Sequence, residues 1–98
     1  MRAALADALA RMLGARVVAS TAVSGGDIND AHRVDLADGR RVFVKTNERA
    51  DPEMFPAEAH GLGFLAEAGA LRTPRVLAVD AEFLVLEWLE SARPRAGF

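Results

Sequence analysis

Two residues of opposite charge occur where the sequence predicts apolar surfaces. Lys45 ends the apolar, strand-like run "VFVKTN", and the period of two in a strand places its side chain on the same face as Phe43. Glu58 follows Phe55 by three residues and precedes Leu62 by four, so helical spacing places it on the apolar face of the next segment. A buried carboxylate without a partner is costly, and the two charges could satisfy each other.

Two interpretations of this pair follow from the residues. One is an ordinary structural ion pair, or two side chains that extend their charged ends to solvent. The other is a fixed cation that binds phosphate. A strand ending in lysine, a helix whose acid holds that lysine, and a preceding glycine-bearing hairpin occur in this order in kinases, where they hold nucleotide phosphates. The order of the three signals favours the second interpretation.

The elements that position this pair can be read from hydrophobic periodicity. Leu5, Leu9, Met12 and Leu13 share one helical face before Gly14. Asp38-Gly39 separates "HRVDLA" from "RRVFVKT", which is a strong hairpin signal. The pattern predicts helices over residues 2–13 and 54–68, the latter with Phe55, Leu62 and Leu65 on one face, a glycine-bearing hairpin tip over 24–30, and strands over 17–23, 31–36, 40–46, 75–79 and 83–88.

Composition limits the class of protein. The chain has 98 residues, 51% hydrophobic content and a net charge of −2, which fits a single globular domain with a core of limited depth. It has no cysteine, so disulfides, thiolate nucleophiles and cysteine-based zinc sites are excluded. Asp7 and Arg11 interrupt the N-terminal apolar stretch, and no membrane-length run follows. We expect a cytoplasmic protein without a nucleic-acid or membrane partner.

Four segments carry a resemblance to a known family. "SGGDINDAHRV", "VFVKTN", "MFPAEAHGLGFLAEAGALRTPRVLAV" and "FLVLEWLE" together resemble the N-terminal lobe of the fructosamine kinase (ketosamine-3-kinase) family, whose relatives include the aminoglycoside phosphotransferases and, distantly, the protein kinases. The resemblance spans about residues 14–90. It implies an α+β fold of the protein-kinase-like N-terminal lobe type: a five-stranded antiparallel sheet, one αC-like helix and an N-terminal helix. Residues 1–90 would form this lobe, and 91–98 would begin a linker to a C-terminal lobe.

The resemblance also implies roles near the phosphates of ATP. Lys45 would contact the α and β phosphates, and Glu58 would hold the lysine in place. The hairpin tip would lie over the phosphates, because glycine permits close approach and backbone N–H groups bind anionic oxygens; a plain turn is the alternative. Asp27 departs from many eukaryotic relatives, which carry cysteine there, and its carboxylate would have to face away from phosphate. The tip consists of Ser24, Gly25, Gly26, Asp27, Ile28 and Asn29.

"LVLEWLE" resembles the kinase hinge. By this resemblance Leu86 would border the adenine, the Glu87 carbonyl would accept from the adenine amino group, and the Leu89 N–H would donate to the ring. Trp88 would belong to the same segment, in the hinge or in core packing. Phe43 would pack on the adenine ring, where aromatic side chains stack favourably. Simple sheet packing of Phe43 is the alternative.

"HRVDL", residues 32–36, is not the catalytic H-R-D loop of protein kinases. It has an extra residue, belongs to a predicted strand, and precedes the lysine strand, whereas the catalytic loop follows the hinge. His32 and His60 are therefore predicted to be partly exposed, and the sequence predicts no metal site in this chain.

The resemblance implies ATP-dependent phosphorylation of the 3-hydroxyl of a fructosamine or ketosamine, a deglycation repair reaction. The base and the ligands of Mg²⁺ would come from a C-terminal lobe, so the 98 residues alone are expected to be inactive. Two alternatives remain. One is another small-molecule kinase of the aminoglycoside or choline kinase type, although "GGDIND" and "FVKTN" favour the fructosamine branch. The other is a non-catalytic binding module that self-associates through an exposed apolar face.

Overall fold

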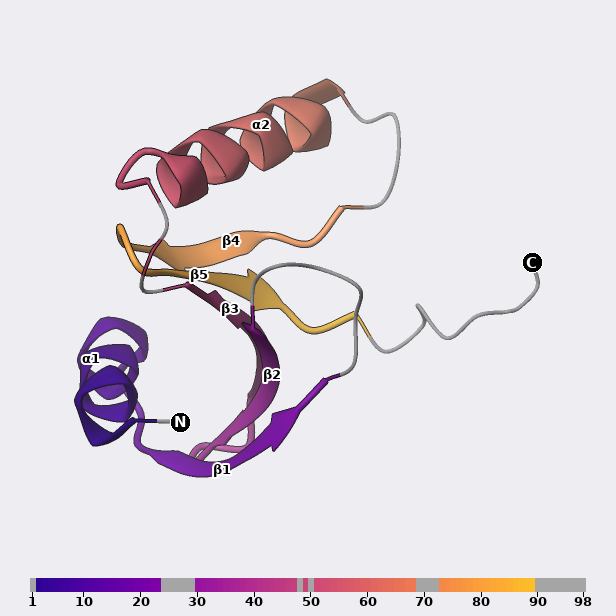
Figure 1. Ribbon diagram of the computed structural model, residues 1–98. Helices are drawn as coiled ribbons and strands as arrows, with labels where there is room; N and C mark the ends of the chain where they lie inside the picture. Colours follow the sequence, from indigo (N-terminus) through magenta and orange to yellow (C-terminus); the bar gives the residue numbers. More distant parts are fainter. Residues whose placement is uncertain (1, 24–29, 48, 50, 69–72, 90–98) are drawn as a thin grey trace.

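The chain folds into one antiparallel sheet and two helices. The computed structural model describes residues 2–23, 30–47, 49, 51–68 and 73–89. The elements, shown in Figure 1, are α1 (Ala3–Leu13), β1 (Val17–Ala22), β2 (Asp30–Leu36), β3 (Arg41–Thr46), α2 (Met54–Ala68), β4 (Val76–Val79) and β5 (Phe83–Glu87). The predicted α+β fold and its order of elements are confirmed.

The strand order differs from the chain order at one place. The five strands lie in the order β1-β2-β3-β5-β4, and every neighbouring pair is antiparallel. β3 is therefore the central strand: it pairs with β2, which precedes it directly, and with β5, which follows only after α2 and β4. This order places the end of β5 beside the start of β3, where Glu87 is the partner of Val42.

The turn between β2 and β3 is the predicted Asp38-Gly39 hairpin. Gly39 has φ of 92°, a conformation that L-residues rarely adopt. The Asp38 carboxylate accepts from the backbone N–H of Arg40 at 3.1 Å and from its Nε at 2.8 Å. The backbone hydrogen bond from Arg40, followed by its side chain, lowers the pKa of Asp38. Arg40 also donates to the carbonyl of Leu13, so the hairpin turn is tied to the end of α1.

The sheet has an apolar cluster on each face. α1 covers one face, where Leu9, Val34 and Val44 are fully buried with their neighbours. α2 covers part of the opposite face, where Phe55 and Leu84 are fully buried and Leu86 nearly so. Figure 1 shows α1 against the concave side of the curved sheet and α2 along β4. Because successive residues of a strand alternate between faces, β3, β4 and β5 contribute to both clusters, whereas β1 and β2 contribute only to the cluster under α1.

Small corrections to the predicted elements concern ends and exposure. β2 begins at Asp30, inside the stretch predicted as a turn. Met12 and Leu65 share helical faces with buried residues, yet they are 46% and 43% exposed. In α2 the apolar spacing continues beyond Leu62, the last helix residue that packs on the cluster, whereas in α1 Met12 lies outside the cluster although the next residue, Leu13, packs on it. α1 ends as predicted at Gly14, which has the left-handed conformation with φ of 77°.

The outer surface carries a few large apolar side chains. Val18 and Phe64 are the most exposed of them, at 53% and 68%. No helix among the described residues has both the length and the apolar character that crossing a membrane requires.

Candidate functional site

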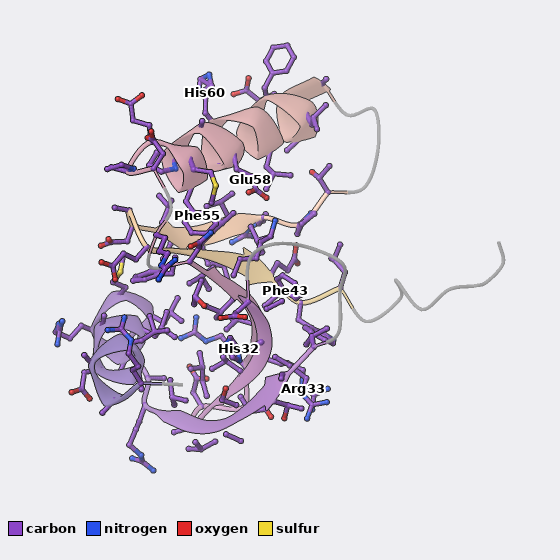
Figure 2. All side chains as sticks on the ribbon, in the orientation of Figure 1. His32, Arg33, Phe43, Phe55, Glu58 and His60 are labelled. Carbon is purple, nitrogen blue, oxygen red and sulfur yellow. The ribbon has the colours of Figure 1, made fainter. Side chains whose placement is uncertain are left out.

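Lys45 and Glu58 form an ion pair between the central strand and the second helix. The Nζ of Lys45 donates to Oε2 of Glu58 at 2.8 Å. The two side chains are 18% and 33% exposed, so the pair lies at the edge of the core rather than in bulk solvent. Figure 2 shows Glu58 on the side of α2 that faces the sheet and His60 on the outer side.

Strand register and helix packing bring these two charges together. Lys45 is paired with Leu84 on β5, and cross-strand partners share a face of the sheet. Leu84 belongs to the cluster that α2 covers, together with the fully buried Phe55. Phe55 fixes the rotation of α2 against the sheet, and Glu58, one turn later, then faces the strand that carries Lys45.

Phe43 lies two residues from Lys45 on the same face. Its cross-strand partners are Leu86 on β5 and Arg33 on β2. The ring centroids of Phe43 and Trp88 lie 6.3 Å apart with an interplanar angle of 33°. The contact joins the central strand to the residue that directly follows β5, so the aromatic residues predicted near the adenine are neighbours.

The predicted hinge residues follow one another at the end of β5. The N–H of Glu87 donates to the carbonyl of Arg75 at 2.8 Å, and its carboxylate accepts from the N–H of Arg75 at 3.2 Å. Leu86 packs in the cluster beside Phe43, and Leu89 is half-buried. Glu87 is thus tied to the start of β4 by both backbone and side chain, which holds this end of β5 in place.

Arg33 is a residue of this face that sequence reasoning missed. Among the described residues, two buried side-chain nitrogens have no hydrogen-bond partner: Nε of Arg33 and Nε1 of Trp88. Both side chains belong to neighbours of Phe43, one across β2 and one in ring contact. The Asp38-Gly39 hairpin could have indicated Arg33, because the register that it sets pairs Arg33 with Phe43.

The residues of the predicted glycine tip, Ser24, Gly25, Gly26, Asp27, Ile28 and Asn29, lie outside the described residues. The base of the hairpin is described. The N–H of Val23 donates to the carbonyl of Ala31 at 2.9 Å, and Ala31 is the cross-strand partner of Lys45. The hairpin between β1 and β2 therefore begins beside Lys45.

The histidines lie away from this face. His32 belongs to β2, is paired with Val44, and lies on the α1 side of the sheet, opposite to Arg33 and Phe43 (Figure 2). His60 is exposed. Within the described part of the chain, no three His, Asp or Glu side chains are grouped so that they could hold a metal ion.

The arrangement joins three chemical features on one face of the sheet. A lysine held by a carboxylate supplies a fixed positive charge, Phe43 supplies an aromatic surface, and two N–H donors lie beside that surface. Such a face suits a ligand that has both a flat ring system with acceptors and an anionic group.

A family model and several relatives match most of this chain, and their descriptions all name kinases of related sugar amines. Residues 1–97 match the family model described as fructosamine kinase. The chain is 40% identical over 83 residues to a "Probable ketoamine kinase" of Synechocystis, covering 80% of this chain, and 48% identical over 66 residues to one of Thermus thermophilus, covering 67%. It is 31% identical over 80 residues, 76% of this chain, to the chloroplastic protein-ribulosamine 3-kinase of Oryza sativa subsp. japonica.

The fold also matches that of a solved structure. A crystal structure assigned as a fructosamine-3-kinase from Thermobifida fusca matches 94% of this chain with a TM-score of 0.74 and 31% identity. The match covers 33% of that structure, and the three relatives are covered over 28%, 23% and 23% of their lengths, so this chain spans about a quarter to a third of the proteins it matches. From the family match over almost all of its residues, the chain belongs to the fructosamine kinase family.

Proposed function

We propose that this chain is the nucleotide-binding lobe of an ATP-dependent kinase that phosphorylates a ketoamine, by family the 3-hydroxyl of a fructosamine. The observation that carries the proposal is the 2.8 Å contact between Lys45 and Glu58 on the face that also carries Phe43. Residues 1–90 are the proposed lobe, and 91–98 are the proposed start of a linker. The family membership and the names of the relatives support the ketoamine substrate.

Lys45 is the proposed ligand of the α and β phosphates. Its ammonium group is held by Glu58, so a phosphate meets a cation whose position is already fixed. The base of the β1–β2 hairpin lies beside Lys45, at Ala31. This supports a role for the tip residues, Gly25 to Asn29, over the same phosphates.

The proposed nucleoside site consists of Phe43 and of the residues at and directly after the end of β5. The adenine would stack on Phe43, beside Trp88 and Leu86. The Glu87 carbonyl and the Leu89 N–H are the proposed hydrogen-bond partners of the base. The ties between Glu87 and Arg75 support this role, because they hold the backbone of the hinge in a fixed position.

The proposed nucleotide site has groups for the base and the phosphates but, among the described residues, no group of side chains for the metal. ATP-dependent kinases use Mg²⁺ and a residue that orients the substrate hydroxyl. The described residues contain no acidic or histidine cluster able to hold a metal, and none of them is proposed as a ligand of Mg²⁺. The proposal therefore limits this chain to binding and orienting the nucleotide.

Trp88 makes nucleotide binding directly measurable. It is the only tryptophan of a chain that has no tyrosine, and its ring contacts Phe43. Titration with ATP is expected to change the Trp88 fluorescence saturably. Lys45→Met is expected to raise the dissociation constant for ATP about tenfold or more and to leave that for adenosine unchanged, because adenosine has no phosphate. The absence of saturable binding of either ligand to the unmodified chain would contradict the proposal.

A second experiment tests the limitation to binding. The chain is incubated with ATP, Mg²⁺ and a fructosyl-lysine peptide, and ADP is measured. The expected result is ATP binding without ketoamine-dependent ADP formation. Ketoamine-dependent turnover that Lys45→Met abolishes would show that these residues form a complete enzyme, and the lobe-only role would be wrong.

A further inference from the structure

Two donors without acceptors flank the same aromatic ring. Nε of Arg33 and Nε1 of Trp88 are buried from solvent, and neither has a hydrogen-bond partner in the described structure. A buried N–H without an acceptor costs free energy, so such groups in a folded protein call for an explanation. Arg33 is the cross-strand partner of Phe43, and Trp88 contacts the Phe43 ring. The two donors are thus on either side of one surface.

The neighbours of Arg33 do not account for its position. Its Nε lies 3.9 Å from Oδ2 of Asp35, beyond hydrogen-bond distance. The other oxygen of Asp35 accepts from Nε of Arg41 at 2.8 Å. Within the described residues, Nη2 of Arg33 donates only to the hydroxyl of Thr21, at 3.5 Å. The guanidinium therefore lies along the sheet with weak contacts, and its side chain is 36% exposed although its Nε is buried.

Position along the sheet separates Arg33 from the phosphate-binding lysine. The Arg33–Phe43 pair lies two residues from the Ala31–Lys45 pair, which corresponds to about 7 Å along the strands. Arg33 is on the side of Lys45 that leads away from the tip of the β1–β2 hairpin. Figure 2 shows Arg33 and Phe43 both on the side of the sheet away from α1. Arg33 thus accompanies the aromatic surface rather than the lysine.

We propose that Arg33 and Trp88 are nucleoside-binding residues: when a nucleotide stacks on Phe43, their side chains turn so that these buried N–H groups donate to acceptors of its base and ribose. This inference rests on the proposed function and adds two donors to it. Stacking alone tolerates any flat ring, whereas two donors on either side of it require acceptors at matching positions. Arg33 and Trp88 would therefore select among ring systems by their acceptors.

Binding measurements with three ligands test the role of Arg33. Arg33→Met keeps the length and apolar stem and removes every donor. By calorimetry this variant is expected to raise the dissociation constants for ATP and adenosine by the same factor, about tenfold. The dissociation constant for tripolyphosphate is expected to stay unchanged. Arg41→Met is the matched control: Arg41 shares the face and the Asp35 contact, but it is paired with Asp35 instead of Phe43, so its loss is expected to change none of the three affinities.

The results distinguish this inference from the proposed function. If Arg33→Met weakens the binding of ATP and of tripolyphosphate but not that of adenosine, Arg33 binds phosphate and the inference is wrong. If Arg33→Met weakens the binding of none of the three ligands while Lys45→Met still weakens ATP binding, the role of Arg33 is structural. The inference then fails, and the proposed function stands. If the unmodified chain binds neither ATP nor adenosine, both fail.

A spectroscopic measurement on the unmodified chain covers the case in which Arg33→Met does not fold. Trp88 is the only tryptophan, so a ¹⁵N-labelled chain gives one indole N–H resonance. Saturation with adenosine is expected to move the indole N–H and the Arg33 Nε–H resonances downfield, as new hydrogen bonds form. Tripolyphosphate is expected to leave both in place. Resonances that do not move with adenosine, under conditions where calorimetry shows it bound, would overturn the inference.

Discussion

Lys45 on the central strand and Glu58 on the second helix lie 2.8 Å apart, nitrogen to oxygen. The contact crosses from β3 to α2 over a cluster anchored by Phe55, and it is partly shielded from solvent. The same ion pair therefore does two things: it fixes the direction of the lysine, and it links the helix to the sheet. These two effects can be measured separately.

The stability effect of the pair is tested by Glu58→Ala. Loss of the carboxylate is expected to lower the free energy of unfolding by about 1 to 2 kcal/mol, because the pair is more buried than a surface pair and less than a fully buried one. Urea denaturation measures the change, and a double-mutant cycle with Lys45→Met isolates the coupling. Glu67→Ala on the exposed end of α2 is the control, with an expected change within about 0.5 kcal/mol. A coupling energy near zero would contradict a stabilising link.

Glycine substitutions are expected to act in opposite directions at two positions. Gly39 has φ of 92°, and an added Cβ would meet no atom within 4 Å, so Gly39→Ala costs only backbone conformation, about 1 to 2 kcal/mol of stability. Gly63 lies inside α2, where the added Cβ also meets nothing, and Gly63→Ala is expected to stabilise the chain by about 0.5 to 1 kcal/mol. Thermal unfolding measures both. Changes of the same sign would show that the hairpin or the helix is wrongly described.

Phe55 and Phe64 give a matched pair on one helix. Phe55 is fully buried, whereas Phe64 is 68% exposed. Phe55→Leu is expected to lower the free energy of unfolding by about 1 to 2 kcal/mol, because the smaller side chain leaves part of the cluster unfilled. Phe64→Leu is expected to change it by less than about 0.5 kcal/mol. Chemical denaturation compares the two variants, and an equal effect would mean that α2 packs on the sheet through another face.

Asp38 makes the stability depend on pH in the acidic range. Its pKa in the folded chain is lower than the usual value of 3.8, first because the Arg40 N–H donates to its carboxylate. Between the lowered pKa of the folded chain and the pKa of 3.8 in the unfolded chain, the unfolded chain binds more protons than the folded one. The stabilisation that Asp38 contributes is therefore fully present above pH 3.8 and is lost as the pH falls through the lowered pKa. The Tm difference between the unmodified chain and Asp38→Asn is therefore expected to be constant above about pH 5 and to shrink below pH 3.8. A difference that grows on acidification would reverse the assignment.

Local signals explain what the sequence could predict. The β2–β3 hairpin follows from Asp38-Gly39, since the turn and the alternating strands around it are contiguous in the chain. The bounds of α2 agree with the predicted 54–68, because apolar spacing begins after the Asp51-Pro52 turn signal and ends before Gly69. The inward direction of Glu58 followed from its spacing to Phe55. Each of these inferences uses only residues within or next to one helix or within two strands joined by a short turn.

The rest depends on contacts between distant segments. Nothing local indicates that β5, rather than β4, lies next to β3, so the contact between Phe43 and Trp88 could not be derived. Helical spacing predicted that Leu65 belongs to the apolar face, yet the sheet covers α2 only as far as Leu62. Periodicity gives the direction of a side chain; the extent of the surface that covers it is a tertiary property.

The central strand acquires its two neighbours by routes of very different length. β2 and β3 are joined by a tight turn, whereas β5 reaches β3 only after α2 and β4 have been synthesised and folded back. Closing the longer loop costs more chain entropy, so we expect the β1–β2–β3 meander to form early and the docking of β5 to come late. Phe43 would then meet Trp88 near the end of folding, and a ligand that contacts both would slow the opening of the segment that assembles last.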